Sequence, residues 1–137
     1  MLRKDVKVAM IARVPLFAGC SKNELRQIAA LADEVDLAAG TKLTKEGSSG
    51  KEFVVIVEGG ADVHRRGRKL RSLGAGDFLG EIALVTGAPR TATVTTTAPT
   101  RALVITAPAF RSLLRNTPSM QLKVLDALAS RLPPETG

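Results

Sequence analysis

Apolar side chains recur at helical spacing at the start of the chain. Over residues 2–13 they form a stripe that predicts an amphipathic helix, which Pro15 ends because proline cannot continue it. Ser21 and Glu24 then form the pattern of a capping box, in which each side chain accepts a hydrogen bond from the other residue's backbone amide. We expect a second helix to run from this cap to about Leu31. Its buried face would consist of Leu25, Ile28, Ala29 and Leu31.

From residue 33 the apolar residues fall into short segments, and glycines separate these segments. The clearest of them is Phe53–Val57. Two later segments, Thr91–Thr97 and Arg101–Thr106, are rich in Thr and Val, which suit half-buried strands, and Pro99 marks the turn between them. Short strands with frequent turns predict an antiparallel barrel or a double-sheet roll.

The helical period returns near Pro108 and predicts two more helices. The first ends before Pro118, and its apolar face would consist of Phe110, Leu113 and Leu114. The second is expected from about Ser119 to Leu132, where Pro133-Pro134 ends it. Its broad apolar face would consist of Met120, Leu122, Val124, Leu125, Leu128, Ala129 and Leu132.

This order of helices, short strands and helices predicts an α+β fold. Its centre would be an antiparallel β-roll of two sheets, similar to a jelly roll, with N-terminal helices before it and two C-terminal helices after it. A length of 137 residues is typical of one domain with a substantial core, so we expect a single domain over residues 1–137. Within it we expect an N-terminal helical unit over 1–31, a roll over 33–107 and C-terminal helices over 108–132.

The chain is basic, with a formal net charge of +7 at pH 7. One predicted hairpin holds a cluster of cations, which are Arg65, Arg66, Arg68, Lys69 and Arg71. Such a cluster can contact nucleic acid, acidic lipid or an acidic partner, or it can keep a hairpin tip soluble, and the last interpretation is favoured. The chain has no Trp or Tyr and four Phe, whereas base stacking requires aromatic side chains. We therefore expect only weak, salt-sensitive binding of nucleic acid by this domain.

Cys20 and His64 are the single cysteine and the single histidine of the chain. One cysteine excludes an intramolecular disulfide, and one residue of each type excludes a Cys/His zinc cluster. Neither has a catalytic partner at recognisable spacing, so no catalytic residue, metal site or enzyme activity is expected. The uncharged apolar run Val8–Ala12 is too short for a signal-peptide core, and no segment approaches the length of a membrane span. A cytoplasmic protein is therefore expected.

Residues 78–94 carry the most informative chemistry in the sequence. Gly80 and Glu81 precede a short apolar turn, and Arg90 follows before an alternating, strand-like segment. The backbone amides of a helix start and the planar donors of Arg90 make an anion site. The adjacent Glu81 is compatible with this site if the ligand also offers a hydroxyl group near its phosphate. The segment favours a sugar phosphate, and a structural ion pair between Glu81 and Arg90 is the alternative.

This segment resembles the phosphate-binding cassette of the cyclic nucleotide-binding domains, which would cover residues 78–92 here. The matching residues are Phe78, Gly80, Glu81, Ala83, Leu84, Arg90, Thr91, Ala92 and Val94. The resemblance continues through Val14–Phe17, Lys45–Gly47, Phe53–Gly59, Leu73–Phe78, Phe110–Leu114 and the run up to Arg131-Leu132. It implies a β-roll fold, a regulatory role and a cyclic nucleotide as ligand, with no cofactor.

The resemblance also implies roles for individual residues. Glu81 would accept a hydrogen bond from the ribose 2′-hydroxyl, Arg90 would pair with the cyclic phosphate, and Gly80 would let the backbone approach the ribose. Backbone amides would face the phosphate oxygens, and an apolar wall would lie under the base. The complete implied set is Val63, Leu70, Leu79, Gly80, Glu81, Ile82, Ala83, Arg90, Thr91 and Ala92.

Several alternatives stay open in the sequence. Thr91 permits cyclic AMP or cyclic GMP, and cyclic AMP is favoured by analogy with bacterial relatives. The last helix would close over the base, cover the roll or contact another subunit in a homodimer. Because the chain ends at Gly137, we expect a stand-alone sensor, or the sensor part of a transcriptional regulator, channel, kinase or transferase whose effector is unknown. A degenerate interaction module that binds no nucleotide is the remaining alternative.

Overall fold

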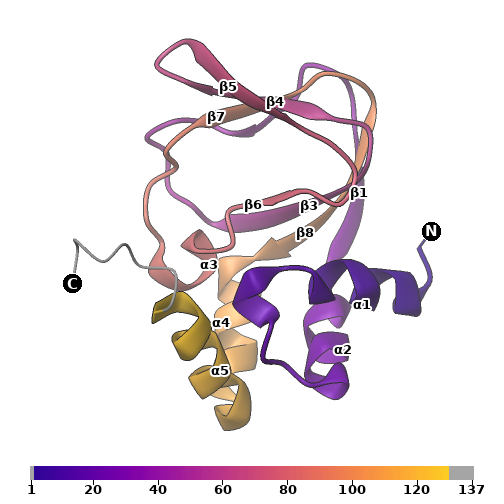
Figure 1. The fold of residues 1–137 in the computed structure, drawn as a ribbon, viewed down its shortest axis with the longest axis vertical. Helices are drawn as coiled ribbons and strands as arrows, with labels where there is room; N and C mark the ends of the chain where they lie inside the picture. The colour runs from indigo at the N-terminus through magenta and orange to yellow at the C-terminus, as the bar shows by residue number, and fades with distance from the viewer. Residues whose placement is uncertain (1, 130–137) are drawn as a thin grey trace.

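Two four-stranded antiparallel sheets face each other, and the helices gather beside one of them (Figure 1). The computed structural model describes residues 2–129. The sheet nearer the helices has the strand order β1-β8-β3-β6. Its strands are β1 (Asp33–Leu37), β8 (Thr100–Thr106), β3 (Glu52–Glu58) and β6 (Phe78–Leu79).

The second sheet forms the opposite wall of the roll and has the order β2-β7-β4-β5 (Figure 1). Its strands are β2 (Lys42–Thr44), β7 (Thr93–Thr96), β4 (Ala61–Arg65) and β5 (Arg68–Leu73). The hairpin of β4 and β5 pairs Val63 with Arg71, and a bulge follows between Val63 and His64. The expected double-sheet roll is thus confirmed.

The helices come before and after the strands, as the sequence pattern predicts. The N-terminal unit contains α1 (Lys4–Ala12), the 3₁₀ helix η1 (Pro15–Phe17) and α2 (Lys22–Ala30). The C-terminal helices are α4 (Ala107–Arg115) and α5 (Pro118–Ala129). A one-turn helix, α3 (Ala83–Thr86), lies inside the cassette segment. None of the helices within residues 2–129 is long and apolar enough to cross a membrane.

The capping box that the sequence predicts is present at the start of α2. The Ser21 hydroxyl accepts a hydrogen bond from the Glu24 amide at 3.1 Å, and the Glu24 carboxylate accepts one from the Ser21 amide at 2.8 Å. Leu25, Ile28 and Ala29 are buried as expected. Leu31 is only partly buried, because the helix ends at Ala30 and Leu31 is its C-cap.

The last helix begins at Pro118, close to the expected start. Its expected residues 130–132, with Pro133-Pro134 and the end of the predicted domain, lie outside the described residues. Met120 and Val124 are buried as expected, and Leu128 packs partly against the core. Leu122 and Leu125 differ, since 73% and 60% of their surface is exposed.

Two apolar clusters hold the layers together. The larger one joins both helical units to the nearer sheet, and three phenylalanine rings lie in it. Phe17 of η1 contacts Phe53 of β3 edge to face, with ring centroids 6.0 Å apart, and contacts Phe110 of α4 at 5.5 Å. The smaller cluster lies inside the roll and consists of Ile56, Ala61, Val63, Leu73 and Val94. The 3₁₀ helix is therefore packed between the sheet and the C-terminal helices.

Candidate functional site

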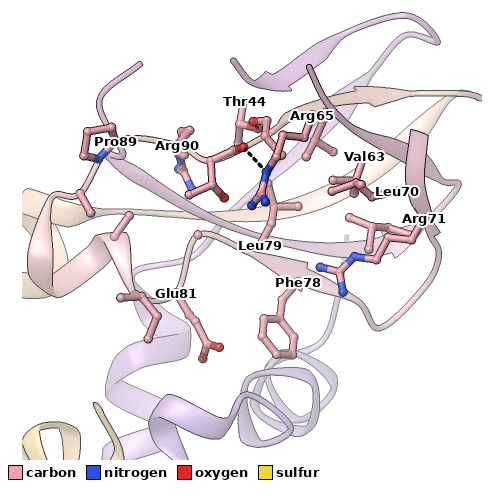
Figure 2. Close-up of a pocket in the computed structure, with 18 residues that line it drawn as sticks. Thr44, Val63, Arg65, Leu70, Arg71, Phe78, Leu79, Glu81, Pro89 and Arg90 are labelled. Atoms are coloured by element: carbon pink, nitrogen blue, oxygen red, sulfur yellow. Dashed lines mark hydrogen bonds between the residues drawn. The ribbon is translucent and has the colours of Figure 1, made fainter. Parts of the chain in front are cut away.

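A pocket of about 550 Å³ opens at the cassette segment, with the β4–β5 hairpin opposite (Figure 2). All of the ligand-binding residues that the sequence predicts line this one pocket. They are Val63, Leu70, Leu79, Gly80, Glu81, Ile82, Ala83, Arg90, Thr91 and Ala92. The fold thus brings the two hairpin residues, Val63 and Leu70, to the cassette, although the sequence separates them from it.

Arg90 has its backbone fixed by the loop before β3. Its amide donates to the Ser48 carbonyl at 2.8 Å, and its carbonyl accepts from the Gly47 amide at 2.8 Å. The guanidinium donates a hydrogen bond to the backbone carbonyl of Glu52. Burial lowers the pKa of this guanidinium from its ordinary value, while the nearby Glu52 carboxylate raises it. Since a guanidinium stays protonated under physiological conditions, the pocket contains a partly desolvated cation.

Two glycines make the space in which the Arg90 side chain lies. At Gly80, which has φ +84°, an added Cβ would lie 2.6 Å from the Glu52 carbonyl oxygen and would collide with the guanidinium. At Gly50 an added Cβ would lie 2.8 Å from the Ala88 carbonyl oxygen and 3.4 Å from the Arg90 Nε atom. In this conformation the side chain of Arg90 therefore lies beside Gly80, where the resemblance predicts the ribose.

The Glu81 carboxylate is buried and turned out of the pocket. Figure 2 shows it pointing away from Arg90, toward the helices. One carboxylate oxygen accepts a hydrogen bond from the backbone amide of Leu16 in η1 at 3.3 Å. The side chains of Glu81 and Arg90 thus diverge in this structure, and the cassette is connected to the N-terminal helical unit through Glu81.

Cassette residues between these two side chains form the short helix α3. The amide of Leu84 bonds to the Glu81 carbonyl at 3.3 Å, and the amides of Val85 and Thr86 bond to the Ile82 carbonyl at 3.1 Å. Ile82 is the N-cap of this turn and Ala83 is its first residue, so their amides lie at the end of the helix where no intrahelical acceptor exists. That these amides face a phosphate stays a prediction.

Two pocket arginines were not in the predicted set. Arg65 and Arg71 belong to the basic hairpin, for which the sequence favours a solvated tip, yet both line the pocket (Figure 2). Arg65 donates from Nε to the Thr91 carbonyl at 3.1 Å. Strand alternation gives no clear signal for them, because a bulge follows Val63 and the adjacent residues Leu70 and Arg71 both line the pocket.

The arrangement has the chemistry of a binding site for an organic phosphate. It joins a partly buried guanidinium and cassette amides to an apolar wall that includes Val63 and Leu79. Within residues 2–129, no group of three or more His, Cys, Asp or Glu side chains could hold a metal ion. The guanidinium of Arg90 is the cation that faces an anionic ligand here, whereas the Glu81 carboxylate would have to turn from η1 to reach a neighbouring hydroxyl group.

Comparisons with known proteins point to one family. The family of the cyclic nucleotide-binding domain matches residues 34–117. The chain is 31% identical over 135 residues to a putative potassium channel protein of Rhodopseudomonas palustris, covering 94% of this chain and 32% of that protein. It is 34% identical over 96 residues to the cAMP-dependent protein kinase regulatory subunit of Mycosarcoma maydis, covering 67% of this chain and 18% of that protein.

The fold also matches a solved structure closely. It superposes with a TM-score of 0.81 and 31% identity on the N-terminal domain of a transcriptional regulator from Streptomyces coelicolor A3(2), covering 89% of this chain and 91% of that one. The chain spans less than two thirds of the channel protein and of the kinase subunit. The similarity is confined to one region of each protein, over 135 residues with the channel protein and 96 residues with the kinase subunit.

Proposed function

The chain belongs to the cyclic nucleotide-binding domain family, and from this premise we propose that its pocket binds cyclic AMP as a regulatory signal. One observation carries the proposal, which is the partly desolvated Arg90 guanidinium between Gly50 and Gly80 in a pocket of about 550 Å³. Burying a cation costs free energy that an anion can restore. A cyclic phosphate supplies that anion and accepts two parallel hydrogen bonds from the guanidinium.

Glu81 is the proposed partner of the ribose 2′-hydroxyl. In the present conformation it accepts a hydrogen bond from the Leu16 amide instead. Ligand binding in this scheme requires the carboxylate to turn from η1 toward the pocket. The carboxylate would then exchange the hydrogen bond from the Leu16 amide for one from the ribose hydroxyl.

The base is proposed to lie against Val63 and Leu70, which line the pocket on the hairpin side. Cyclic AMP is favoured because a kinase regulatory subunit among the relatives carries cAMP dependence in its name. Cyclic GMP is the second candidate, and the pocket position of Arg71 favours it. An arginine can donate two hydrogen bonds to O6 and N7 of guanine, whereas adenine has a donor in place of O6.

The output is proposed to pass through α5. Leu122 and Leu125 are exposed and Leu128 is partly buried, so the helix presents apolar surface that could cover a bound base. Ligand would shift the population toward such a closed state through its better contacts there. The effector is proposed to be a separate domain or protein, because the chain matches only 32% of the channel protein and 18% of the kinase regulatory subunit, and a homodimer stays a proposal.

Thermal unfolding with cyclic AMP and with cyclic GMP tests the proposal. A ligand at about 100 times its dissociation constant stabilises the native state by about 2.7 kcal/mol, which corresponds to a rise in Tm of roughly 10 °C for a domain of this size. We expect Arg90→Ala to abolish most of this rise and Arg68→Ala, at an exposed position outside the pocket, to retain it. No rise with either nucleotide would favour the alternative of a degenerate interaction module. Competition titration of the two nucleotides on one sample then decides the preference.

A further inference from the structure

A second hollow is lined by residues of α1 and α2 and shares no residue with the nucleotide pocket. It has a volume of about 880 Å³. Its apolar lining comes mainly from small side chains, which are Val8, Ala9, Ala29 and Ala30. A floor of alanines leaves room for another backbone to approach at the axis distance of packed helices, about 8–10 Å. We name this hollow the α1–α2 groove.

Cations form both rims of the α1–α2 groove. Lys4 and Lys7 belong to the α1 rim, and Lys22 and Arg26 belong to the α2 rim. One acidic residue, Asp5, also lines it, but the Arg3 side chain lies 3.7 Å from the Asp5 carboxylate and offsets its charge. The groove therefore combines an apolar floor with an excess of positive charge.

The walls of the groove are held at a fixed separation. Ile11 of α1 and Ile28 of α2 are fully buried in the same apolar cluster. The Lys7 ammonium donates to the Ala32 carbonyl, beyond the end of α2, at 3.3 Å. Because the groove is already formed, binding a partner requires little further ordering of this chain, so the entropic cost of docking is small.

We propose that the α1–α2 groove docks an acidic amphipathic helix of a protein partner. Lys22 and Arg26 are one helical turn apart, about 6 Å along the axis, which matches acidic residues at i and i+4 on a docked helix. The apolar side of that helix would lie on the alanine floor, as in other helix-in-groove complexes. The charges on the two rims would then fix the register of the helix.

Other anionic partners fit the groove less well. A lipid surface needs large apolar side chains that protrude, whereas the apolar residues here are three alanines and a partly exposed valine, Val8. Nucleic acid would meet an apolar floor without aromatic side chains for stacking. The proposal does not depend on nucleotide binding, because none of the groove residues lines the nucleotide pocket.

The test uses a synthetic helical peptide of about 18 residues, or five turns, with Glu at i and i+4 beside a Leu and Ala face. The protein, labelled with ¹⁵N, is titrated with this peptide and with a peptide of the same composition in scrambled order. We expect chemical-shift changes concentrated in residues 4–9 and 22–30 for the ordered peptide, and weaker binding as salt rises. Equal binding of the scrambled peptide, or shifts concentrated in the basic hairpin, would overturn the proposal.

Matched charge reversals complete the test. Lys22→Glu with Arg26→Glu is expected to weaken peptide binding by about tenfold or more. The control is Lys42→Glu with Arg68→Glu, at exposed positions of the second sheet, which changes the net charge by the same amount. We expect the control to keep the peptide affinity within about twofold of the wild type. Equal loss in both pairs contradicts a specific groove. If the first pair unfolds the protein, the neutral pair Lys22→Gln with Arg26→Gln takes its place. Tighter binding of a DNA duplex or of phosphatidylglycerol vesicles at the groove residues would assign the surface to another class of partner and overturn the proposal.

Discussion

The ammonium of Lys123 lies 2.6 Å from the carboxylate of Glu24, so a charged contact joins α5 to α2. Ser119 of α5 donates to the same carboxylate at 2.8 Å, and the Ser21 amide completes its set of donors. Hydrogen bonds from Lys123, Ser21 and Ser119 hold the pKa of Glu24 at about 2. Glu24 thus acts both as a helix cap and as the attachment point of the last helix.

We expect Glu24→Gln to lower the free energy of unfolding by about 1–3 kcal/mol at pH 7. The amide of Gln can still cap α2, but Lys123 loses the carboxylate that balances its charge. Urea denaturation measures the change. Glu58→Gln is the control, because Glu58 and Arg101 form an exposed pair 3.8 Å apart, and solvent screening makes the loss of such a pair nearly neutral for stability. Equal effects of the two substitutions would contradict the role of the Glu24 contact.

The same contact predicts how stability depends on pH. The pKa of Glu24 is lower in the folded protein, at about 2, than its ordinary value of 4.5. Its stabilising contribution is therefore complete above the ordinary value and is lost as the pH falls toward 2. We expect the stability difference between the wild type and Glu24→Gln to shrink over this range in urea titrations. Because the two proteins differ only at residue 24, the pH-dependent contributions of other carboxylates cancel in this difference. Asp62 is one of them, since the Ser72 hydroxyl and Lys69 lower its pKa. A constant difference would contradict the prediction.

Gly80 is expected to be required for the position of Arg90. In Gly80→Ala the added Cβ meets the guanidinium and the Glu52 carbonyl, so ligand affinity should fall by more than about tenfold, the scale of a lost charge-assisted contact. Calorimetric titration measures the affinity. Gly40→Ala is a matched control, because Gly40 has the same φ of +84° but nothing lies within 4 Å of its added Cβ. The control carries the same backbone strain, and binding should be retained in it.

The proposed reorientation of the Glu81 side chain can be measured both in the pocket and at η1. In the pocket, 2′-deoxy cyclic AMP should bind less tightly than cyclic AMP to the wild type, and the two should bind equally to Glu81→Ala, since the substitution removes the acceptor. At η1, hydrogen exchange of the Leu16 amide should become faster with ligand, because this amide loses the carboxylate that it contacts at 3.3 Å. A constant penalty for the deoxy ligand in both proteins would remove Glu81 from the ribose site.

The lid role of α5 gives a prediction about its exposed face. Leu122→Ser with Leu125→Ser should leave the stability of the ligand-free protein nearly unchanged, because both side chains are mostly exposed, but should weaken ligand binding. Amide exchange over residues 119–129 should slow when ligand is added to the wild type. Met120→Ala is the contrasting variant, since Met120 is fully buried and its loss should destabilise the fold by about 2–5 kcal/mol. Unchanged affinity and exchange would exclude a lid.

Features that depend on residues close together in the sequence were predictable from it. The capping box of α2 follows from Ser21 and Glu24, and the cassette glycine at Gly80 follows from the motif around it. The orientation of Glu81 was not predictable, because its hydrogen-bond partner Leu16 is distant in sequence and reaches it only after the helices pack. The pocket position of Arg71 depends on the register of the β4–β5 hairpin, which a charge pattern does not specify.

The basic hairpin has a kinetic consequence for any anion that enters the pocket. Arg65 and Arg71 line the cavity, and Arg66, Arg68 and Lys69 complete the cationic cluster of the same hairpin. Concentrated positive potential at a cavity accelerates diffusional encounter, and mobile ions screen it over roughly 8 Å at physiological ionic strength. The rate of capture would therefore slow as salt is added, while the lifetime of the bound state would depend mainly on the sheltered guanidinium of Arg90.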